Sequence, residues 1–467
     1  MGHLLISAAH KSSGKTTVSL GLCRALKRKG LSVQPFKKGP DYIDPMWLEA
    51  AAGQPCRNLD FYTMTADEIL GCFAVNSRTA DISIVEGNKG LYDGLHLDGS
   101  NSNAALAKML GAPVVLVIDA RGMTRGIAPL ILGYQAFEPD INIAGVILNK
   151  IGGRRHEAKL RAIIEHYTDV PLIGAVQRAP EMEILERHLG LVPSNEEGQS
   201  DSLIDTIADA LEGQVDLDAL IDIGQTARFD YQGPAQPQRV TGNTPLKIGI
   251  ARDSAFGFYY TSDLEALTAA GADLVPIDTM HDQALPPLDG LFIGGGFPET
   301  HAIALEGNAA LRSSIAEAVE DGLPTYAECG GLMYLCRSLT WDGVTCEMVG
   351  VIPADVTLHD TPQGRGYVRL KETGAAPWPA HQGKGGKGFE FPGHEFHYSR
   401  LEGLPTDTKF AYEVTRGYGI DGKNDGIVYK NMLASYSHLR DAESHHWAHR
   451  FVGLVRSHKD HLTQKTA

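Results

Sequence analysis

The sequence predicts an α/β protein of two domains, and three observations lead to that prediction. The chain has 467 residues, which is too long for a single hydrophobic core. In both halves, short apolar runs rich in β-forming residues alternate with longer helical patterns, as in parallel strands joined by helices. Residues 225–245 contain prolines and polar residues without apolar periodicity, so we expect a linker there. The predicted domains are therefore residues 1–224 and 246–455.

Composition and charge narrow the class of protein. No apolar run approaches the roughly 20 residues of a membrane span, and the first residues do not resemble a secretory signal, so we expect a cytoplasmic protein without a membrane partner. The six cysteines form no CxxC pair, which is typical of a reducing compartment. A net charge of −15 argues against nucleic acid as a partner. The sequence leaves room for a homodimer.

The first domain is predicted to contain a parallel sheet. Strands are expected over residues 4–8, 32–36, 81–85, 114–118 and 143–148, with helices after most of them. Right-handed βαβ units place ligands at the carboxyl ends of such strands. We therefore expect the polar motifs that follow each strand to form one site.

The motif after the first strand has the pattern of a phosphate-binding loop. It runs from Ala9 to Thr17 and carries Gly-Lys-Thr, although Ala9 replaces the usual first glycine. Backbone N–H groups of such a loop cradle phosphates, while Lys15 can reach the β- and γ-phosphates and Thr16 can bind Mg²⁺. Lys11 either contacts the nucleotide or is a solvated loop lysine. The expected nucleotide-binding residues are Lys11, Ser12, Ser13, Gly14, Lys15, Thr16 and Thr17.

Carboxylates follow the second and third strands. Asp41 and Asp44 come after the second strand, and Glu86 ends the third. Because Mg²⁺ prefers oxygen ligands, we expect Thr16, Asp41 and Glu86 to hold it beside the γ-phosphate. An alternative is that Asp41 and Asp44 only form an Asx turn. Lys38 and Tyr42 complete this expected acidic and substrate site, and an anionic substrate would also need a basic surrounding made by Lys37, Lys38, Lys89 and Arg121.

Two further polar residues end later strands of the first domain. Asp119 is either an acid on the metal side or a helix cap for the residues from Thr124 onward. Asn149 could hydrogen-bond the adenine of a nucleotide, or it could be a turn residue.

The second domain contains one cysteine that is a candidate nucleophile. Cys329 lies between an apolar run and a helical pattern, which predicts a nucleophile on a sharp strand-to-helix turn with the helix N-terminus behind its sulfur. The backbone of Gly295 and Gly296, which follow another buried strand, can point N–H groups at a developing oxyanion. The predicted nucleophile therefore has a candidate oxyanion site in its own domain.

Histidines supply the candidate base. His438 follows a strand-like run near the end of the domain, whereas His394 and His397 form the rival pair, with a metal site as a further alternative for those two. His445, His446 and His449 are expected to coat the surface of a C-terminal helix. Residues 374–388 are expected to form an exposed insertion loop of low order.

Taken together, these motifs resemble those of the cobyrinic acid a,c-diamide synthases. That family joins an ATP-binding domain, related to dethiobiotin synthetase and built as a phosphate-loop NTPase, to a class I glutamine amidotransferase domain of the cobyric type. The resemblance spans nearly the whole chain and is carried by seven stretches: residues 12–17, 37–45, 85–87 followed by 90–94, 294–299, 328–335, 393–399 and 434–439.

The resemblance implies that Cys329 is the nucleophile, His438 its base, and Asp41, Asp44 and Glu86 the acidic residues of the ATP domain. The cobyric type lacks the third member of the catalytic triad, and Arg440 stands at the position where many relatives carry that acid. The implied reaction consumes ATP with Mg²⁺, takes ammonia from glutamine and amidates carboxylates of an anionic tetrapyrrole.

Two alternatives to this function stay open. Residues 88–89 and 99–104 differ from the corrinoid pattern, so a sirohaem amidase acting on a sirohydrochlorin-type ring is the first. A nucleotide-switched scaffold ATPase with a decayed amidase domain is the second.

Overall fold

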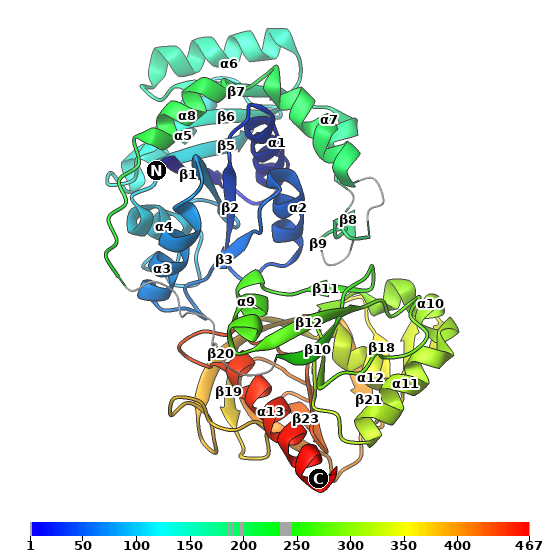
Figure 1. Ribbon diagram of the computed structural model, residues 1–467. Helices are drawn as coiled ribbons and strands as arrows, with labels where there is room; N and C mark the ends of the chain where they lie inside the picture. Colours follow the sequence, from blue (N-terminus) through cyan, green and yellow to red (C-terminus); the bar gives the residue numbers. More distant parts are fainter. Residues whose placement is uncertain (1, 185, 188–189, 197–199, 234–244, 467) are drawn as a thin grey trace. The chain divides into compact units, whose positions relative to one another are not determined.

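The computed structural model describes residues 2–184, 186–187, 190–196, 200–233 and 245–466. Of the predicted linker, residues 234–244 lie outside the described part of the chain. The chain divides into two compact units, Met1–Phe61 with Thr65–Gln236 and Tyr62–Met64 with Pro237–Ala467. Each unit is built around its own sheet (Figure 1).

The first unit contains a seven-stranded parallel sheet in the order β3-β2-β4-β1-β5-β6-β7. Its strands are β1 Gly2–Ala8, β2 Val33–Lys38, β3 Arg57–Leu59, β4 Ile82–Glu86, β5 Val114–Asp119, β6 Ile143–Ile151 and β7 Leu172–Gln177. Its helices are α1 Lys15–Arg28, α2 Ile43–Ala52, α3 Ala66–Ser77, α4 Asn103–Leu110, α5 Ile127–Phe137, α6 Arg154–Tyr167, α7 Ser200–Glu212 and α8 Leu217–Gln225. The unit also contains a short 3₁₀ turn at Pro180–Met182 and a small hairpin made of β8 Glu186–Arg187 and β9 Gly190–Leu191. All five predicted strands are confirmed, with ends that coincide with the prediction or differ from it by at most three residues.

Burial explains why this sheet could be predicted. Every residue of β5 is buried, because helices cover both faces of the sheet. Figure 1 shows α1, α2 and α7 on one side and α3 and α4 on the other. The carboxyl ends of β1, β2 and β4 lie side by side, so the residues that follow these strands share one edge.

The second unit contains a nine-stranded mixed sheet in the order β12-β10-β13-β15-β24-β23-β22-β19-β20. The first five strands run parallel, and the last four continue the sheet in antiparallel fashion. Its strands are β10 Leu246–Ala251, β12 Ala272–Ile277, β13 Gly290–Ile293, β15 Thr325–Glu328, β19 Gly364–Glu372, β20 Glu390–His397, β22 Lys409–Arg416, β23 Asn424–Tyr429 and β24 Met432–Ser435.

Smaller elements complete the second unit. A four-stranded sheet has the order β17-β16-β18-β21, and β11 pairs with β14. These strands are β11 Phe256–Phe258, β14 Gly295–Gly296, β16 Cys336–Trp341, β17 Val344–Glu347, β18 Ile352–Leu358 and β21 Ser399–Glu402. The helices are α9 Thr261–Ala269, α10 Ala302–Gly307, α11 Ala309–Glu320, α12 Gly330–Leu335 and α13 Trp447–Thr466, with a 3₁₀ turn at Pro298–His301.

The segment between β19 and β20 differs from the expectation of an exposed loop of low order. Trp378 in this segment is only 5% exposed, and its ring lies 4.8 Å from that of Tyr326 and 6.1 Å from that of Phe451. The guanidinium of Arg450 donates a hydrogen bond of 2.8 Å to the carbonyl of Pro379. The expectation is wrong for this part of the loop, because one large aromatic side chain joins the core and holds the surrounding glycine-rich backbone against it.

Within the described residues, no helix is both long and apolar enough to span a membrane.

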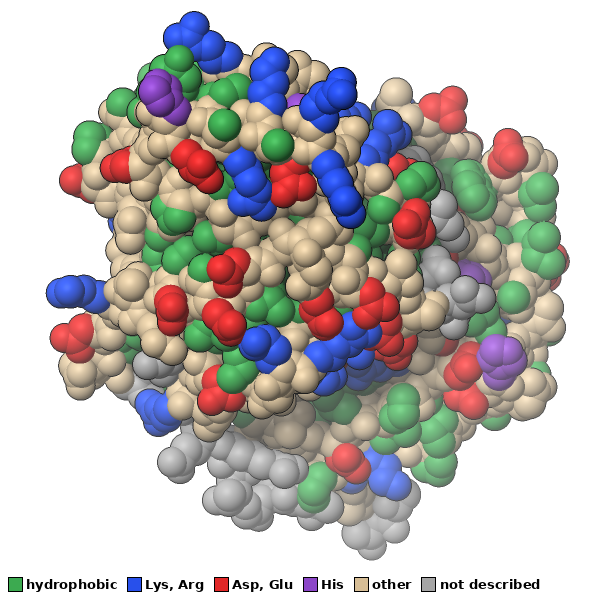
Figure 2. Space-filling model, turned by 90° about the horizontal axis from the view of Figure 1, so that it is seen from above, with side chains coloured by type: hydrophobic (Ala, Val, Ile, Leu, Met, Phe, Trp, Pro, Cys, Tyr) green, Lys and Arg blue, Asp and Glu red, His purple; other side chains and the backbone are tan. Residues whose placement is uncertain are grey.

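On the face of the molecule drawn in Figure 2, Lys and Arg side chains lie among Asp and Glu side chains. The acidic excess of the chain is therefore interspersed with basic groups on this face.

Candidate active site

The loop between β1 and α1 has the backbone shape of a phosphate-binding loop. Ser12 and Gly14 have positive φ angles of 65° and 81°, and α1 begins directly afterwards at Lys15. A Cβ atom on Gly14 would lie 2.1 Å from the amide nitrogen of Asn149, so only glycine fits there. The Nδ2 atom of Asn149 instead donates a hydrogen bond of 2.9 Å to the carbonyl of Ser13. Asn149 thus fixes the loop through its backbone.

Side chains of the loop point in different directions. Lys11 is exposed, whereas Ser13 is buried and its hydroxyl donates to the carbonyl of His10 at 2.8 Å. Lys15 lies 3.0 Å from an oxygen of Glu86. The structure therefore brings the loop lysine to the carboxylate that ends β4.

Acidic residues from two strand ends meet at Thr16. Its hydroxyl donates to Oε1 of Glu86 at 2.9 Å and lies 3.3 Å from Oδ2 of Asp44. Lys37, buried at the end of β2, lies 3.0 Å from Glu86 and is also bonded to Asp44. Asp41 lies farther out, 3.8 Å from Lys37, and its Oδ1 accepts the backbone N–H of Asp44 at 3.0 Å. Asp41 therefore makes the turn considered as the alternative while remaining beside the acidic cluster.

The pKa values of two of these carboxyl groups, those of Glu86 and Asp41, are shifted in opposite directions. Burial alone would raise the pKa of Glu86, but the ammonium groups of Lys15 and Lys37 outweigh it and lower the pKa to about 2. Burial, reinforced by the negative charge of Asp44, raises the pKa of Asp41 to about 6. Glu86 is thus held as a carboxylate, while Asp41 gains a proton more easily.

The cluster suits Mg²⁺. The Oε2 atom of Glu86 is buried and has no hydrogen-bond partner within the described part of the chain. A hydroxyl and carboxylates at one point are the oxygen donors that Mg²⁺ takes together with phosphate and water. Thr16, Asp44 and Glu86 are brought together directly, with Asp41 next to them.

Lys38 adds a second buried lysine to this edge. Its ammonium group donates to Oδ1 of Asn88 at 3.2 Å and lies 5.8 Å from the ring centre of Phe61. Burial lowers the pKa of Lys38 to about 8, although Asp60 opposes that effect. Tyr42, just before α2, is also buried.

Asp119 is paired with two cations, and it does not cap the helix that follows. The guanidinium of Arg121 donates to its carboxylate at 2.7 to 3.0 Å, and the ammonium of Lys150 lies 3.4 Å away. Burial would raise the pKa of Asp119, but the hydrogen bonds from Arg121 outweigh it and lower the pKa. The helix α5 begins only at Ile127, so Asp119 does not cap it. The carboxylate serves as the partner of two cations.

The asparagines that distinguish residues 99–104 support the loop above the sheet. Asn103 is fully buried and donates hydrogen bonds to the hydroxyl of Ser7 at 3.0 Å and to the carbonyl of Gly90 at 2.9 Å. Asn101 accepts the backbone N–H of Leu95 at 2.7 Å. These side chains therefore shape the loop from within.

In the second unit, Cys329 occupies a strained turn between β15 and α12. Its φ of 48° and ψ of −103° are unusual for a residue with a side chain, as in nucleophile elbows. Its backbone N–H donates to the carbonyl of Ser435 at 2.7 Å, which fastens the turn to β24. A Cβ on Gly331 would lie 2.1 Å from the carbonyl oxygen of Ile293, so the turn packs too closely for any larger residue there.

His438 meets this turn from the neighbouring strand. Its side chain forms a hydrogen bond with Cys329, and its Nδ1 atom lies 3.2 Å from Oε2 of Glu328. Burial would lower the pKa of His438, but the hydrogen bonds with Cys329 and Glu328 outweigh it and raise the pKa to about 10. The buried imidazole is thus stabilised as a cation beside the sulfur.

Glu328 occupies the place of the third triad member, which the resemblance leads one to expect to be missing. Its other oxygen, Oε1, accepts the backbone N–H of Leu439 at 2.9 Å and the hydroxyl of Tyr326. The guanidinium of Arg440 lies over the ring of Tyr260 at 4.6 Å. The orienting carboxylate therefore comes from Glu328, the residue before Cys329. It does not come from the position two residues after His438, where the chain has Arg440.

The rival histidines have other neighbours. The ring of His394 stacks on that of His438 with centres 4.9 Å apart, and burial lowers its pKa well below the usual value. His397 stacks on Tyr436 at 3.8 Å, and its Nδ1 lies 2.9 Å from the carbonyl of Ser399. The structure thus places the two histidines against different rings.

Gly295 and Gly296 form β14 beside the Cys329 turn. A Cβ on Gly295 would lie 2.7 Å from Cε1 of His438, and a Cβ on Gly330 would lie 3.0 Å from the backbone nitrogen of Gly296. The glycine backbone therefore passes directly along the cysteine and histidine.

The expectation that three C-terminal histidines coat a helix surface is wrong for His445. That residue is 1% exposed, and its ring stacks on Phe391 with centres 3.9 Å apart. Burial lowers the pKa of His445 to about 4. His445 precedes α13, so the helical periodicity assumed for it does not apply.

Two residues of these sites were missed as site residues by sequence reasoning. Lys37 was considered only as part of the basic surroundings, yet it lies at the centre of the acidic cluster. Glu328 was read only as part of the elbow motif. In both cases the available signal was a charged residue at or next to the end of a strand, directly after an apolar or aromatic residue.

Comparisons with known proteins agree with the arrangement of the two units. Residues 5–192 match the CobQ/CobB/MinD/ParA nucleotide binding domain, and residues 247–445 match the CobB/CobQ-like glutamine amidotransferase domain. Among curated proteins, the cobyrinate a,c-diamide synthase of Magnetococcus marinus is 46% identical over 450 residues, covering 95% of this chain and 95% of that protein. Proteins of the same name from Methanosarcina acetivorans and Listeria innocua are 43% and 38% identical, covering 93% and 94% of this chain and 92% and 96% of their own lengths.

Proposed function

The chain belongs to the family of cobyrinate a,c-diamide synthases, and on that premise we propose that it amidates peripheral carboxylates of cobyrinic acid with ammonia from glutamine, at the expense of ATP. The observation that carries the proposal is the buried set of Cys329, His438 and Glu328 in one unit of a chain whose other unit holds a phosphate-binding loop. We assign amide synthesis to residues 1–224, glutamine hydrolysis to residues 246–455, and the linker to residues 225–245.

The second domain releases ammonia. The sulfur of Cys329 attacks the carboxamide carbon of glutamine, and His438 gives a proton to the leaving ammonia. Water, deprotonated by His438, then hydrolyses the thioester to glutamate. Glu328 holds the imidazole in the required orientation and stabilises its charge. The backbone of Gly295 and Gly296 is placed to stabilise the oxyanion of each tetrahedral intermediate.

The first domain activates the acceptor. A carboxylate is a poor electrophile, so its oxygen first attacks the γ-phosphate of ATP, and ADP leaves. Ammonia then attacks the acyl phosphate, and phosphate leaves with the amide formed. Residues Lys11 to Thr17 are the proposed nucleotide contacts, with Lys15 stabilising charge on the γ-phosphate. Asn149 supports that loop rather than the adenine.

Mg²⁺ would be held by Thr16, Asp44 and Glu86, with Asp41 beside them, where it would neutralise charge on the β- and γ-phosphates. Lys38 and Tyr42 are our candidates for contacts to the substrate, because they lie buried on the same strand edge. The six cysteines are free thiols, which supports a cytoplasmic setting. The homodimer stays a prediction that sedimentation of the purified chain would test.

Two other functions make different demands on the same chain. A sirohydrochlorin-type substrate was suggested by residues 88–89 and 99–104, but Asn101 and Asn103 support their own loop. A scaffold ATPase with a decayed amidase domain would not need an intact set of thiol, imidazole and carboxylate. The intact set favours an active amidase, and the name shared by the relatives favours cobyrinic acid as its substrate.

A direct assay distinguishes these functions. Purified protein would receive ATP, Mg²⁺ and glutamine with either cobyrinic acid or sirohydrochlorin, and mass spectrometry would identify the amides formed. We expect a diamide of cobyrinic acid. Preferential amidation of sirohydrochlorin would replace the substrate proposed here, and a nucleotide-dependent dimer without glutaminase activity would support the scaffold instead.

A further inference from the structure

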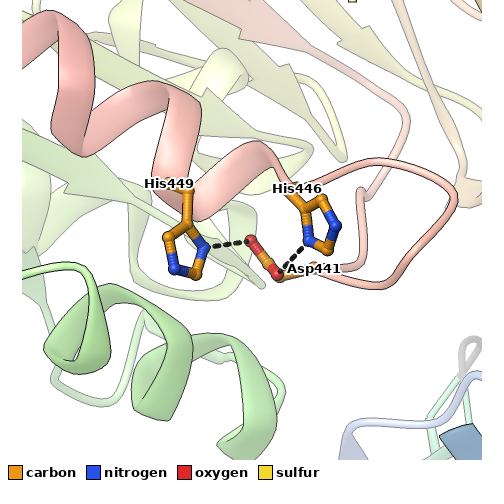
Figure 3. Close-up of side chains that lie close together, drawn as sticks. All are labelled: Asp441, His446 and His449. Carbon is orange, nitrogen blue, oxygen red and sulfur yellow. Dashed lines mark hydrogen bonds and ion pairs between the residues drawn. The ribbon is translucent and has the colours of Figure 1, made fainter. Parts of the chain in front are cut away.

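Three side chains around the start of α13 form a group that neither active centre uses. Asp441 lies in the loop after β24, His446 immediately precedes α13, and His449 is in its first turn (Figure 3). One oxygen of Asp441 is 3.5 Å from Nδ1 of His446, and the other is 3.7 Å from Nδ1 of His449. Figure 3 shows both rings turned toward the carboxylate, and one ligand atom from each residue lies within 4.8 Å of the other two.

Both separations exceed the length of a typical hydrogen bond and are close to the distance between two ligands of one ion, although they run to different oxygens of Asp441. A hydrogen bond from nitrogen to oxygen is usually about 2.9 to 3.0 Å long. Ligands at about 2.0 to 2.2 Å from a tetrahedral ion are about 3.3 to 3.6 Å from one another. The Nδ1 atom of His449 is buried and has no hydrogen-bond partner within the described part of the chain. An ion between the three side chains would use that nitrogen.

A third imidazole lies against both histidines of the group, and its ring is edge-on to that of His446 with centres 5.5 Å apart. His381, in the segment between β19 and β20, stacks on His449 with ring centres 4.8 Å apart and planes inclined by 26°. The stacking contact helps to hold the ring of His449 in its orientation.

We propose that Asp441, His446 and His449 bind one divalent transition-metal ion, of which Zn²⁺ is the best fit, with water in the fourth position. Two imidazoles and one carboxylate are ligands that Zn²⁺ takes at three-residue sites with an open position. Mg²⁺ prefers an all-oxygen octahedron and suits this group poorly. The site is independent of the amidation reaction.

The ion would connect the catalytic segment to the last helix. Asp441 follows His438 by three residues, and its carboxylate accepts the backbone N–H of Ala448 in α13 at 2.8 Å. Its own backbone N–H donates to Asp263 at 3.1 Å. Because the folded protein would bind the ion and the unfolded chain would not hold this geometry, binding would raise the melting temperature.

The test compares Zn²⁺ titrations of untagged, chelator-treated protein in the presence of excess Mg²⁺. Isothermal titration calorimetry would give stoichiometry and affinity for the wild type, His449→Gln, and the double variant His446→Gln/His449→Gln. His461→Gln, an exposed histidine on the same helix, is the matched control. Co²⁺ would serve as a spectroscopic probe, since tetrahedral coordination gives d–d absorption bands that octahedral hydrated Co²⁺ lacks in intensity.

We expect one Zn²⁺ per chain to be lost in the double variant, an affinity at least 10-fold lower in His449→Gln, and unchanged binding in His461→Gln. Zn²⁺ held by Cys329 and His438 would survive the double substitution, so the difference between titrations isolates the proposed site. Circular dichroism would verify that the variants fold. Equal Zn²⁺ binding by the folded double variant and the wild type, or absence of saturable binding to the wild type, would overturn the proposal.

Discussion

The carboxylate of Glu328 and the imidazole of His438 lie 3.2 Å apart across two neighbouring parallel strands, although 110 residues separate them in sequence. Both side chains are buried. The contact fixes one ring nitrogen of the imidazole, and we therefore propose Glu328 as a positioning residue for His438.

Replacing that carboxylate should impair glutamine hydrolysis alone. Glu328→Gln removes the charge that helps to raise the pKa of His438, so we expect glutamine-dependent synthesis to fall on the order of 10²-fold or more. The alkaline limb of the glutaminase pH profile should move to lower pH, because the imidazolium loses a stabilising partner. Ammonia-dependent synthesis, measured on the same preparation, is the control for folding. An unchanged pH profile would remove Glu328 from the mechanism.

The choice of histidine can be tested by the nitrogen source. Cys329→Ser and His438→Gln should abolish synthesis with glutamine but preserve it with concentrated ammonia, which bypasses the thioester. His397→Gln should leave the ratio of the two activities near that of the wild type, because His397 contacts Ser399 and Tyr436 instead. Loss of only the glutamine reaction in His397→Gln, with His438→Gln active, would show that the other histidine is the base.

The acidic cluster should produce the opposite pattern. In Glu86→Gln, Asp44→Asn and Asp41→Asn we expect synthesis to fall on the order of 10²-fold with both nitrogen sources, because oxygen ligands beside the transferred phosphoryl group are lost. Raising the Mg²⁺ concentration should recover part of the activity. Asp140→Asn, at a highly exposed carboxylate of the same unit, is the control. Wild-type rates in all three variants would mean that the metal lies elsewhere.

The lowered pKa of Lys38 leads us to expect that substrate binding depends on pH. Its pKa is lowered to about 8, so the ammonium is present below pH 8 and is lost above it. Affinity for a polyanionic tetrapyrrole, followed by direct titration, should therefore weaken as the pH rises through about 8. Lys38→Arg keeps its charge throughout this range and should lack that transition. If the transition persists in Lys38→Arg, it belongs to another group.

The buried loop residue Trp378 predicts an effect on stability. Trp378→Ala should lower the free energy of unfolding by about 3 to 5 kcal/mol, because it empties a space between aromatic rings of the core. Urea denaturation monitored by circular dichroism would measure this change. Lys387→Ala, at an exposed position of the same segment, should change it by less than about 0.5 kcal/mol. Equal stability of the two variants would contradict the packing of this loop.

Sequence reasoning recovered the features that depend on buried strands. Five of the seven strands of the main sheet in the first unit could be predicted because helices cover both faces of that sheet, so that strands such as β5 are apolar up to their last residue. The position of Cys329 could be predicted because a strand and a helix meet there. In these cases local composition determines local structure.

The features that were missed depend on contacts distant in sequence. Glu328 is adjacent to the nucleophile in sequence, but its partner is reached only through the pairing of β15 with β24. Trp378 lies among glycines and prolines. Because this segment has no periodic apolar pattern, the sequence gives no sign that one of its side chains is buried. His445 lies before α13, so its burial follows from Phe391 and Arg450, which are distant or across a helix boundary.

The pairing of β15 with β24 also has a consequence for the biogenesis of the enzyme. Thr325 to Glu328 align with Met432 to Ser435, so the proposed nucleophile Cys329 and its proposed base His438 follow strands that are made far apart in time during translation. A nascent chain that has exposed Cys329 still lacks its base and the strand that fastens its turn. With the site proposed above, glutamine hydrolysis starts only after synthesis has passed His438, and shorter chains do not release ammonia.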